Sequence, residues 1–161
     1  MTIYLDFDQT VNSEPYPKIG VPVPGSIETI KLLIDRGHRI ILNTARINVG
    51  GMQEINRVFV WFMKNGIDLH GHTSSKLHPL SYSMAINHLK NAGKFFINNS
   101  ENYLYIDDIG EGVPLTKYNG VEVVDWKRVK SDLLRCGFII DHSAETGTMI
   151  FRKSQDIEEN E

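Results

Sequence analysis

The sequence predicts an α/β fold: a single Rossmann-like domain in which helices flank one parallel sheet. Short apolar runs at residues 3–6, 39–43 and 103–106 carry this prediction, because each has the length of a buried strand and ends in polar residues. Segments with helical spacing of apolar residues lie between them. Strand–helix alternation implies right-handed crossovers, and therefore parallel strands.

The first half of the chain supports this fold element by element. Residues 3–6 form the first expected strand, and residues 11–24 are rich in Pro and Gly, which predicts a loop or short flap. A helix is expected to follow the Pro-Gly-Ser of residues 24–26 and to end at Gly37. Residues 39–43 then form the second expected strand.

The second half continues the alternation. Gly50 and Gly51 precede an expected helix that ends at Gly66. The further strands expected in the same sheet are residues 67–69, 103–106 and 121–124, and the further helices are residues 80–91 and 126–135. These elements complete a sheet with helices on its faces.

The end of the chain departs from this alternation. Two β-rich pieces, residues 138–140 and 148–151, flank a turn-like segment and predict a terminal hairpin over residues 137–153. Such a hairpin would protect a sheet edge or form a dimer contact. We expect one domain over residues 1–153 and a disordered acidic tail at residues 154–161.

Composition narrows the class of protein. The net charge of −3 argues against broad, unspecific affinity for nucleic acids. The single cysteine, Cys136, excludes an internal disulfide and fits a reducing compartment. The chain enters its first apolar run almost at once, so we expect no leader peptide, and no run reaches about 18 apolar residues. We therefore expect a cytoplasmic protein that does not bind a membrane.

Two pairs of carboxylates follow expected strands. Asp6 and Asp8 end the first apolar run, and Asp107 and Asp108 end the run at residues 103–106. Ligands of open α/β sheets bind outside the carboxyl ends of the strands, so the two pairs should face one pocket. Hard oxygen ligands suit Mg²⁺, which usually takes one or two carboxylates together with substrate phosphate. The sequence predicts a Mg²⁺ site here.

A third apolar run ends in Asn43, Thr44, Ala45 and Arg46. A threonine hydroxyl can bind a phosphoryl oxygen, and arginine can bind phosphate through paired donors. Asn43 and Arg46 are therefore candidate substrate-binding residues, with Arg46 expected at the pocket mouth. A surface salt bridge is the alternative role for Arg46.

These motifs together resemble the haloacid dehalogenase superfamily of phosphohydrolases, and most closely its small, nearly capless bacterial and phage members. The family's Asp-x-Asp-x-Thr motif matches Asp6, Asp8 and Thr10, its second motif matches Thr44, and its acidic fourth motif matches Asp107 and Asp108. The resemblance covers about residues 2–125. Gln9 departs from it, because many relatives have glycine there.

The resemblance implies a mechanism and assigns the site. Asp6 would be the nucleophile that forms an aspartyl-phosphate, and Asp8 would be the general acid and base. Mg²⁺ would be bound by Asp6, the backbone carbonyl of Asp8, and one or both of Asp107 and Asp108.

The third motif of the family is a lysine that, with Thr44, would bind the phosphoryl oxygens. The loop at residues 74–79 favours Lys76 for this role, and Lys90 and Lys94 are the alternatives.

The expected reaction is Mg²⁺-dependent hydrolysis of a phosphomonoester. The substrate class stays open between a small molecule, a nucleic-acid end and a phosphoprotein, because a short flap leaves the site accessible unless a homodimer covers it. Residues 44–46 and 106–108 also resemble the 3′-phosphatase domain of phage polynucleotide kinase, which makes a nucleotide or polynucleotide 3′-phosphatase the alternative. A non-catalytic binding module of the same fold is a competing class, which the presence of Asp6, Asp8, Thr44 and the fourth-motif acids disfavours. A Mg²⁺-dependent phosphotransferase is a third possibility.

Overall fold

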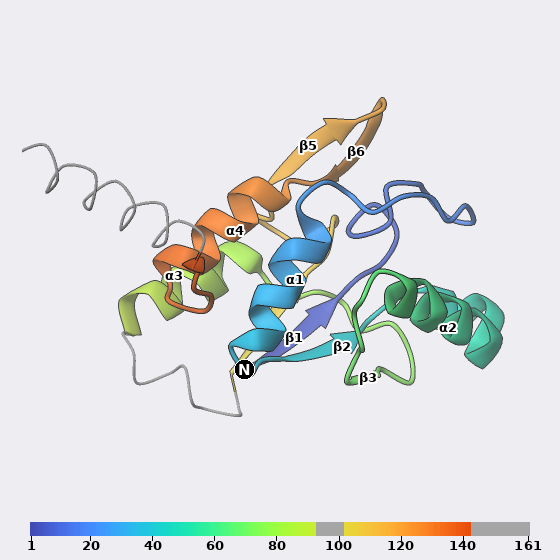
Figure 1. Cartoon of the computed structure of the whole chain (residues 1–161), viewed down its shortest axis with the longest axis horizontal. Coiled ribbons are helices and arrows are strands. Elements are labelled where there is room, and N and C mark those ends of the chain that lie inside the picture. Colours follow the sequence, from blue (N-terminus) through green and yellow to red (C-terminus); the bar gives the residue numbers. More distant parts are fainter. Residues whose placement is uncertain (93–101, 143–161) are drawn as a thin grey trace, which may run out of the picture.

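A four-stranded parallel sheet lies at the centre of the computed structural model, which describes residues 1–92 and 102–142 (Figure 1). Its strands stand in the order β3-β2-β1-β4. They are β1 (Thr2–Leu5), β2 (Arg39–Leu42), β3 (Gly71–His72) and β4 (Tyr103–Ile106). The prediction of an α/β fold with a parallel sheet flanked by helices is confirmed for these residues.

Strand register aligns the polar residues that follow the strands. Leu5 of β1 pairs with Leu42 of β2 and with Ile106 of β4, so the three strands end at the same level. The next residues, Asp6 and Asp107 among them, therefore emerge side by side at one edge of the sheet.

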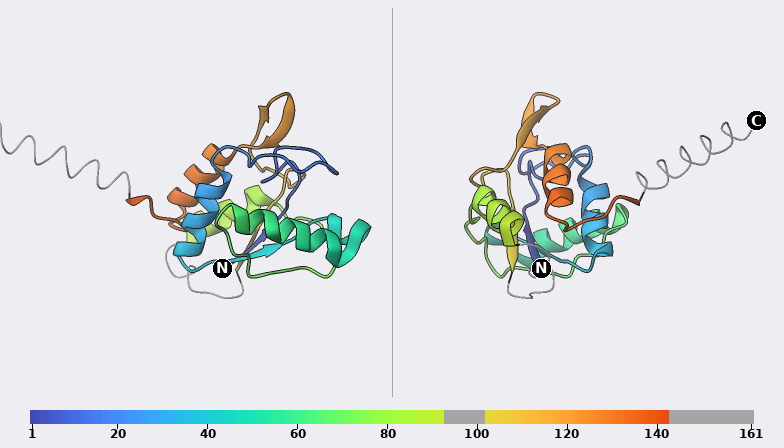
Figure 2. Two further views of the ribbon diagram at one scale, coloured as in Figure 1. Left: turned by 45° about the vertical axis from the view of Figure 1, so that its right-hand side comes forward. Right: turned by 90° about the vertical axis from the view of Figure 1, so that its left-hand side faces the viewer.

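Within the described residues, four helices lie around the strands: α1 (Ser26–Asp35), α2 (Arg46–Lys64), α3 (Tyr82–Ala92) and α4 (Trp126–Arg135). The right-hand view of Figure 2 shows α3 on one side of the strands and α1 and α4 on the other. Successive side chains of a strand point to opposite faces of the sheet, and on one face Ile3 and Leu5 of β1 are buried in the core. On the opposite face Tyr4 stacks on Tyr105, with ring centroids 4.8 Å apart.

The third strand lies later in the chain than predicted. Residues 67–69 were expected in the sheet, but Ile67 and Leu69 are core residues of a connecting segment, and β3 is Gly71–His72. The chain must first leave the end of α2, where the Ile67 N–H bonds the Phe62 carbonyl, before it reaches the edge of β2.

The prediction that residues 121–124 form a fifth parallel strand is wrong. They form β6 (Val121–Val124), which pairs antiparallel with β5 (Leu115–Tyr118) in a separate two-stranded sheet that projects from the molecule (Figure 1). Asn119 and Gly120 join the two strands with φ angles of 50° and 79°. A two-residue Asn-Gly turn of this kind closes a tight local hairpin, so β6 pairs with its sequence neighbour.

Two further boundaries differ from the prediction. Helix α2 was expected to begin after Gly51, but it begins at Arg46. Gly51 lies inside the helix and interrupts its helical geometry with a φ of 60°. Residues 138–140 form no strand. Phe138 instead packs into the core, and its carbonyl bonds the ring of His38. The second arm of the predicted hairpin, residues 148–151, and the predicted acidic tail lie outside the described residues.

The predicted flap after β1 is a loop fastened at both ends. The side chain of Asn12 donates to the carbonyls of Glu14 and Lys18 and accepts from the N–H of Gly20. The Trp61 indole of α2 donates to the Gly20 carbonyl at 3.0 Å. Within the described part of the chain, no helix has the length and apolar character needed to cross a membrane.

Candidate functional site

Three carboxylates gather where β1 and β4 end. Asp6 follows β1, Asp107 and Asp108 follow β4, and one carboxylate oxygen from each lies within 4.8 Å of the others. The Asp6 N–H bonds the Ile106 carbonyl, which extends the strand pairing to the acid itself. Asp6 and Asp107 are buried, so this cluster of acids is shielded from most of the solvent.

Lys76 supplies the opposite charge. Its ammonium donates to Asp6 Oδ1 at 2.9 Å and to the Asn43 carbonyl at 3.0 Å, and it forms an ion pair with Asp107. Lys90 lies exposed on α3, and Lys94 lies outside the described residues. Of the two described candidates for the third-motif lysine, the structure therefore brings Lys76 to the acids.

Asn43 positions the loop that carries Lys76. Its side-chain oxygen accepts from the Thr73 hydroxyl and from the Leu77 N–H, and its amide donates to the Leu77 carbonyl at 3.0 Å. The sequence predicted Asn43 as a substrate-binding residue. The structure instead commits its side chain to the 73–77 loop, a role that sequence spacing could not reveal because the partners lie about thirty residues away.

Thr10 connects the two acidic strand ends, although it was not among the predicted site residues. Its hydroxyl donates to Asp6 Oδ2 at 2.9 Å and accepts from the Asp108 N–H at 3.1 Å. The Trp126 indole at the start of α4 donates to the Thr10 carbonyl. The threonine that closes the Asp-x-Asp-x-Thr motif was the signal that could have identified it.

Burial and crowding set the protonation of the cluster. Burial raises the pKa of Asp6 well above its usual range, the charges of Asp107 and Asp108 raise it further, and Lys76 opposes both effects. Burial likewise raises the pKa of Asp108. For Lys76, burial opposes the charged form, but the Asp6 and Asp107 carboxylates outweigh it and raise the pKa. One ammonium thus faces three carboxylates that would gain from a further cation.

The side chain of Asp8 points to Arg46. Nε of Arg46 donates to Asp8 Oδ2 at 2.9 Å, and Nη2 donates to Asp8 Oδ1 at 2.7 Å. Arg46 was expected at the pocket mouth as a substrate contact. Its placement at the mouth is wrong, because the side chain is only 1% exposed. The predicted metal role of Asp8 concerned its backbone carbonyl, and the side-chain geometry leaves that role open.

Thr44 is buried at the start of α2. Its hydroxyl oxygen accepts the backbone N–H of Arg46 at 3.2 Å, two residues further along the chain. It follows β2 directly, so it stands at the same edge of the sheet as the acids. The predicted site residues therefore share this edge, with Asn43 and Arg46 serving as supports for their neighbours.

Gln9 has a positive φ of 58°, a conformation that glycine adopts without strain. Its side-chain amide donates to the Glu122 carbonyl, and its own carbonyl accepts from the Val124 N–H. These bonds hold β6 beside the turn that carries Asp8. Gln9, which stands where many relatives have glycine, therefore uses its side chain to contact the β5–β6 hairpin.

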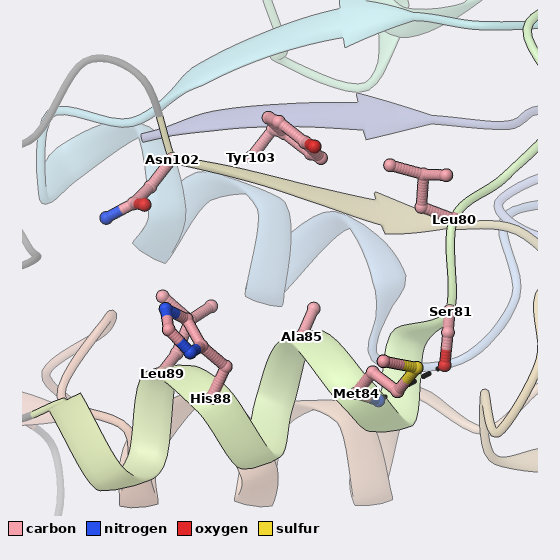
Figure 3. Close-up of a pocket in the computed structure, with 8 residues that line it drawn as sticks. All are labelled: Leu80, Ser81, Met84, Ala85, His88, Leu89, Asn102 and Tyr103. Atoms are coloured by element: carbon pink, nitrogen blue, oxygen red, sulfur yellow. Dashed lines mark hydrogen bonds between the residues drawn. The ribbon is translucent and has the colours of Figure 1, made fainter.

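A hollow lies away from the acids. It has a volume of about 540 Å³ and lies between α3 and β4 (Figure 3). Figure 3 shows Met84, Ala85, His88 and Leu89 rising from α3 opposite Leu80 and Tyr103. Its lining is mainly apolar and contains none of the clustered acids, so it does not suit a phosphoryl group.

Comparison with known proteins supports the fold. No protein-family model matches the chain, and no curated protein matches its sequence. A solved structure of a conserved protein coded by a locus of Bacteroides thetaiotaomicron is similar, with 25% sequence identity and a TM-score of 0.53. The match covers 84% of this chain and 89% of that protein. It agrees with the α/β architecture and names no activity.

Proposed function

We propose that this chain is a Mg²⁺-dependent phosphomonoester hydrolase of the haloacid dehalogenase type, with Asp6 as its nucleophile. The observation that carries the proposal is the surroundings of Asp6. Its buried carboxylate is held by Lys76 and Thr10 and stands beside two further acids at the carboxyl end of a parallel sheet. A carboxylate oriented in this way is suited to attack a bound electrophile.

The reaction proceeds in two displacements. An oxygen of Asp6 attacks the phosphorus atom, the bond from phosphorus to the leaving oxygen breaks, and Asp8 gives its proton to that oxygen. Water then attacks the aspartyl-phosphate and gives a proton to Asp8, and the bond from phosphorus to Asp6 breaks. Inorganic phosphate leaves, and both carboxyl groups return to their starting state.

The residues of the cluster fit a divalent cation. Asp6, Asp107 and Asp108 offer oxygen ligands only, which matches the preference of Mg²⁺. Burial, and then the neighbouring carboxylates, raise the pKa of Asp6 and of Asp108. A bound Mg²⁺ would supply positive charge that offsets the charge of the phosphoryl oxygens.

Two further groups are suited to the phosphoryl oxygens. Lys76 already stands beside the nucleophile with a charge stabilised by its acidic partners, and Thr44 follows β2 at the same edge of the sheet and carries a hydroxyl group. Fixed donors of this kind stabilise charge that develops in the transition state.

The test is phosphate release from a panel of phosphorylated compounds, with Mg²⁺ and with chelator. The panel includes 3′- and 5′-nucleotides, a 3′-phosphorylated oligonucleotide, sugar phosphates and a phosphopeptide. Wild type is compared with Asp6→Asn and with the exposed control Asp68→Asn. We expect Mg²⁺-dependent release in wild type and Asp68→Asn and none in Asp6→Asn. Equal release by the Asp6→Asn variant, with its fold verified by circular dichroism, would refute the proposal.

A further inference from the structure

We propose that Arg46 is a positioning residue that fixes the carboxyl group of Asp8 and couples its orientation to residues 13–22 of the flap. The inference rests on the proposed hydrolase in one respect, the use of Asp8 in proton transfer. The coupling itself is a property of the fold and can be measured without activity.

The contact with the Arg46 guanidinium fixes the plane of the Asp8 carboxylate. Two donors of one guanidinium meet the two oxygens of one carboxylate at 2.9 and 2.7 Å, which is the paired geometry that restricts both position and rotation. Asp8 Oδ1 also accepts from the Asn12 amide at 3.1 Å. From the described residues Oδ2 receives one hydrogen bond, so it is the oxygen with room for a proton to be exchanged.

The same guanidinium holds the flap. Nη2 of Arg46 also donates to the carbonyls of Pro17 at 3.3 Å and Lys18 at 3.2 Å, and the Tyr16 ring lies over the guanidinium at 4.9 Å. Asn12 repeats the link, since its amide donates both to Asp8 and to the Lys18 carbonyl. A shift of the flap therefore acts on Asp8 through two side chains.

The opposite side of Arg46 is anchored in the helix layer. Nη1 donates to Glu54 Oε2 at 2.9 Å, and the guanidinium lies 5.2 Å from the centre of the Phe7 ring. At 1% exposure, with two carboxylates as partners, the side chain is buried, and moving it to a substrate would leave buried charges unpaired. These contacts support a positioning role in place of a direct substrate contact.

The experiment compares Arg46→Lys with Arg57→Lys. Lysine keeps the buried charge but cannot provide the paired donors. Arg57 is a matched control, because it lies on the same helix, also pairs with Glu54, and is 59% exposed. Tyr16→Ala is the milder second variant, since it removes only the exposed ring over the guanidinium.

The first readout is tryptic cleavage after Lys18 in the folded protein, followed by mass spectrometry. Arg46→Lys and Asp8→Asn should each speed this cleavage by about fivefold or more, because local opening of the flap becomes easier. The double variant should add little to either single one, which is the signature of a shared contact. Unchanged cleavage in Arg46→Lys, or independent effects of the two substitutions, would overturn the coupling, whether or not the chain is a phosphatase.

The second readout is kcat/KM for an alkyl phosphate and for 2,4-dinitrophenyl phosphate, whose leaving group departs without a proton. Arg46→Lys should lower the first by about 10²-fold and the second by less than about threefold, since only the first needs Asp8 as an acid. Tyr16→Ala should shift the ratio in the same direction to a smaller degree. Equal losses on both substrates would show a merely structural role, and a rise confined to KM would show a substrate contact. If wild type hydrolyses neither, the proposed function fails and the tryptic assay alone decides the coupling.

Discussion

Replacement of Lys76 by methionine tests how the acid cluster is balanced. Lys76 is 15% exposed, and its partners Asp6 and Asp107 are 9% and 2% exposed, so both ion pairs are largely removed from water. Removing one partner of a buried pair costs about 3–5 kcal/mol. Methionine keeps most of the apolar stem of lysine, so we expect the free energy of unfolding to fall by about 3 kcal/mol, near the lower end of this range. This corresponds to a fall of about 6–12 °C in Tm.

The pH dependence of this loss identifies its cause. Because burial raises the pKa of Asp6 in the folded protein, the folded state holds its proton to higher pH than the unfolded state does. The resulting contribution to stability is present below the ordinary Asp value of 3.8 and is lost as the pH rises through the raised value. Lys76 lowers the pKa of Asp6, so its removal raises this pKa further. The variant should therefore lose more stability than wild type as the pH rises.

The assay is urea unfolding in chelator at several pH values, followed by circular dichroism. The control is Lys130→Met, whose ion pairs with Glu28 and Asp141 lie at the surface and should contribute less than about 1 kcal/mol. A loss in the Lys76 variant that is no larger than in the control, or one that does not grow with pH, would refute the reasoning.

Three further predictions concern single residues. Asp108→Asn should raise Tm in chelator at pH values well above the ordinary Asp value of 3.8, because burial raises the pKa of this carboxyl and disfavours its charged form. The same variant should weaken the stabilisation of the protein by Mg²⁺; thermal melts with and without Mg²⁺ test both, and a lower Tm in chelator would contradict the first. Gly120→Ala should cost about 1–2 kcal/mol, because its φ of 79° disfavours a side chain although the added methyl has open space, and urea unfolding that matched wild type would contradict this. Asn43→Ala should lower kcat by releasing the 73–77 loop that carries Lys76, and an unchanged rate on the best substrate of the panel would show that the loop holds without it.

The sequence predicted the parts of this fold that local patterns determine. The buried strands β1, β2 and β4 follow from apolar runs, and the acids that follow β1 and β4 meet because parallel strands end at one level. The Asn119-Gly120 pair was an available local signal for the β5–β6 hairpin. This turn pairs β6 with β5, whereas strand–helix alternation alone predicted that β6 would join the parallel sheet.

The supporting residues of the site could not be predicted in the same way. Arg46 lies 38 positions from Asp8, and its burial depends on how the flap folds over α2. Asn43 reaches the loop at residues 73–77 only because β2 and β3 are neighbours in the sheet. Both roles depend on contacts between distant segments, for which residue type and spacing carry no signal.

The most direct test of the central claim is to look for the phosphorylated carboxylate itself. Wild type and Asp6→Asn would be mixed with the best substrate of the panel and Mg²⁺, quenched in acid within one turnover, and digested for mass spectrometry. The account predicts one added phosphoryl group on Asp6 in wild type, lost on treatment with hydroxylamine, and none in the variant. Phosphate release without this adduct, or an adduct that persists in Asp6→Asn, would contradict the assignment of Asp6 as the nucleophile.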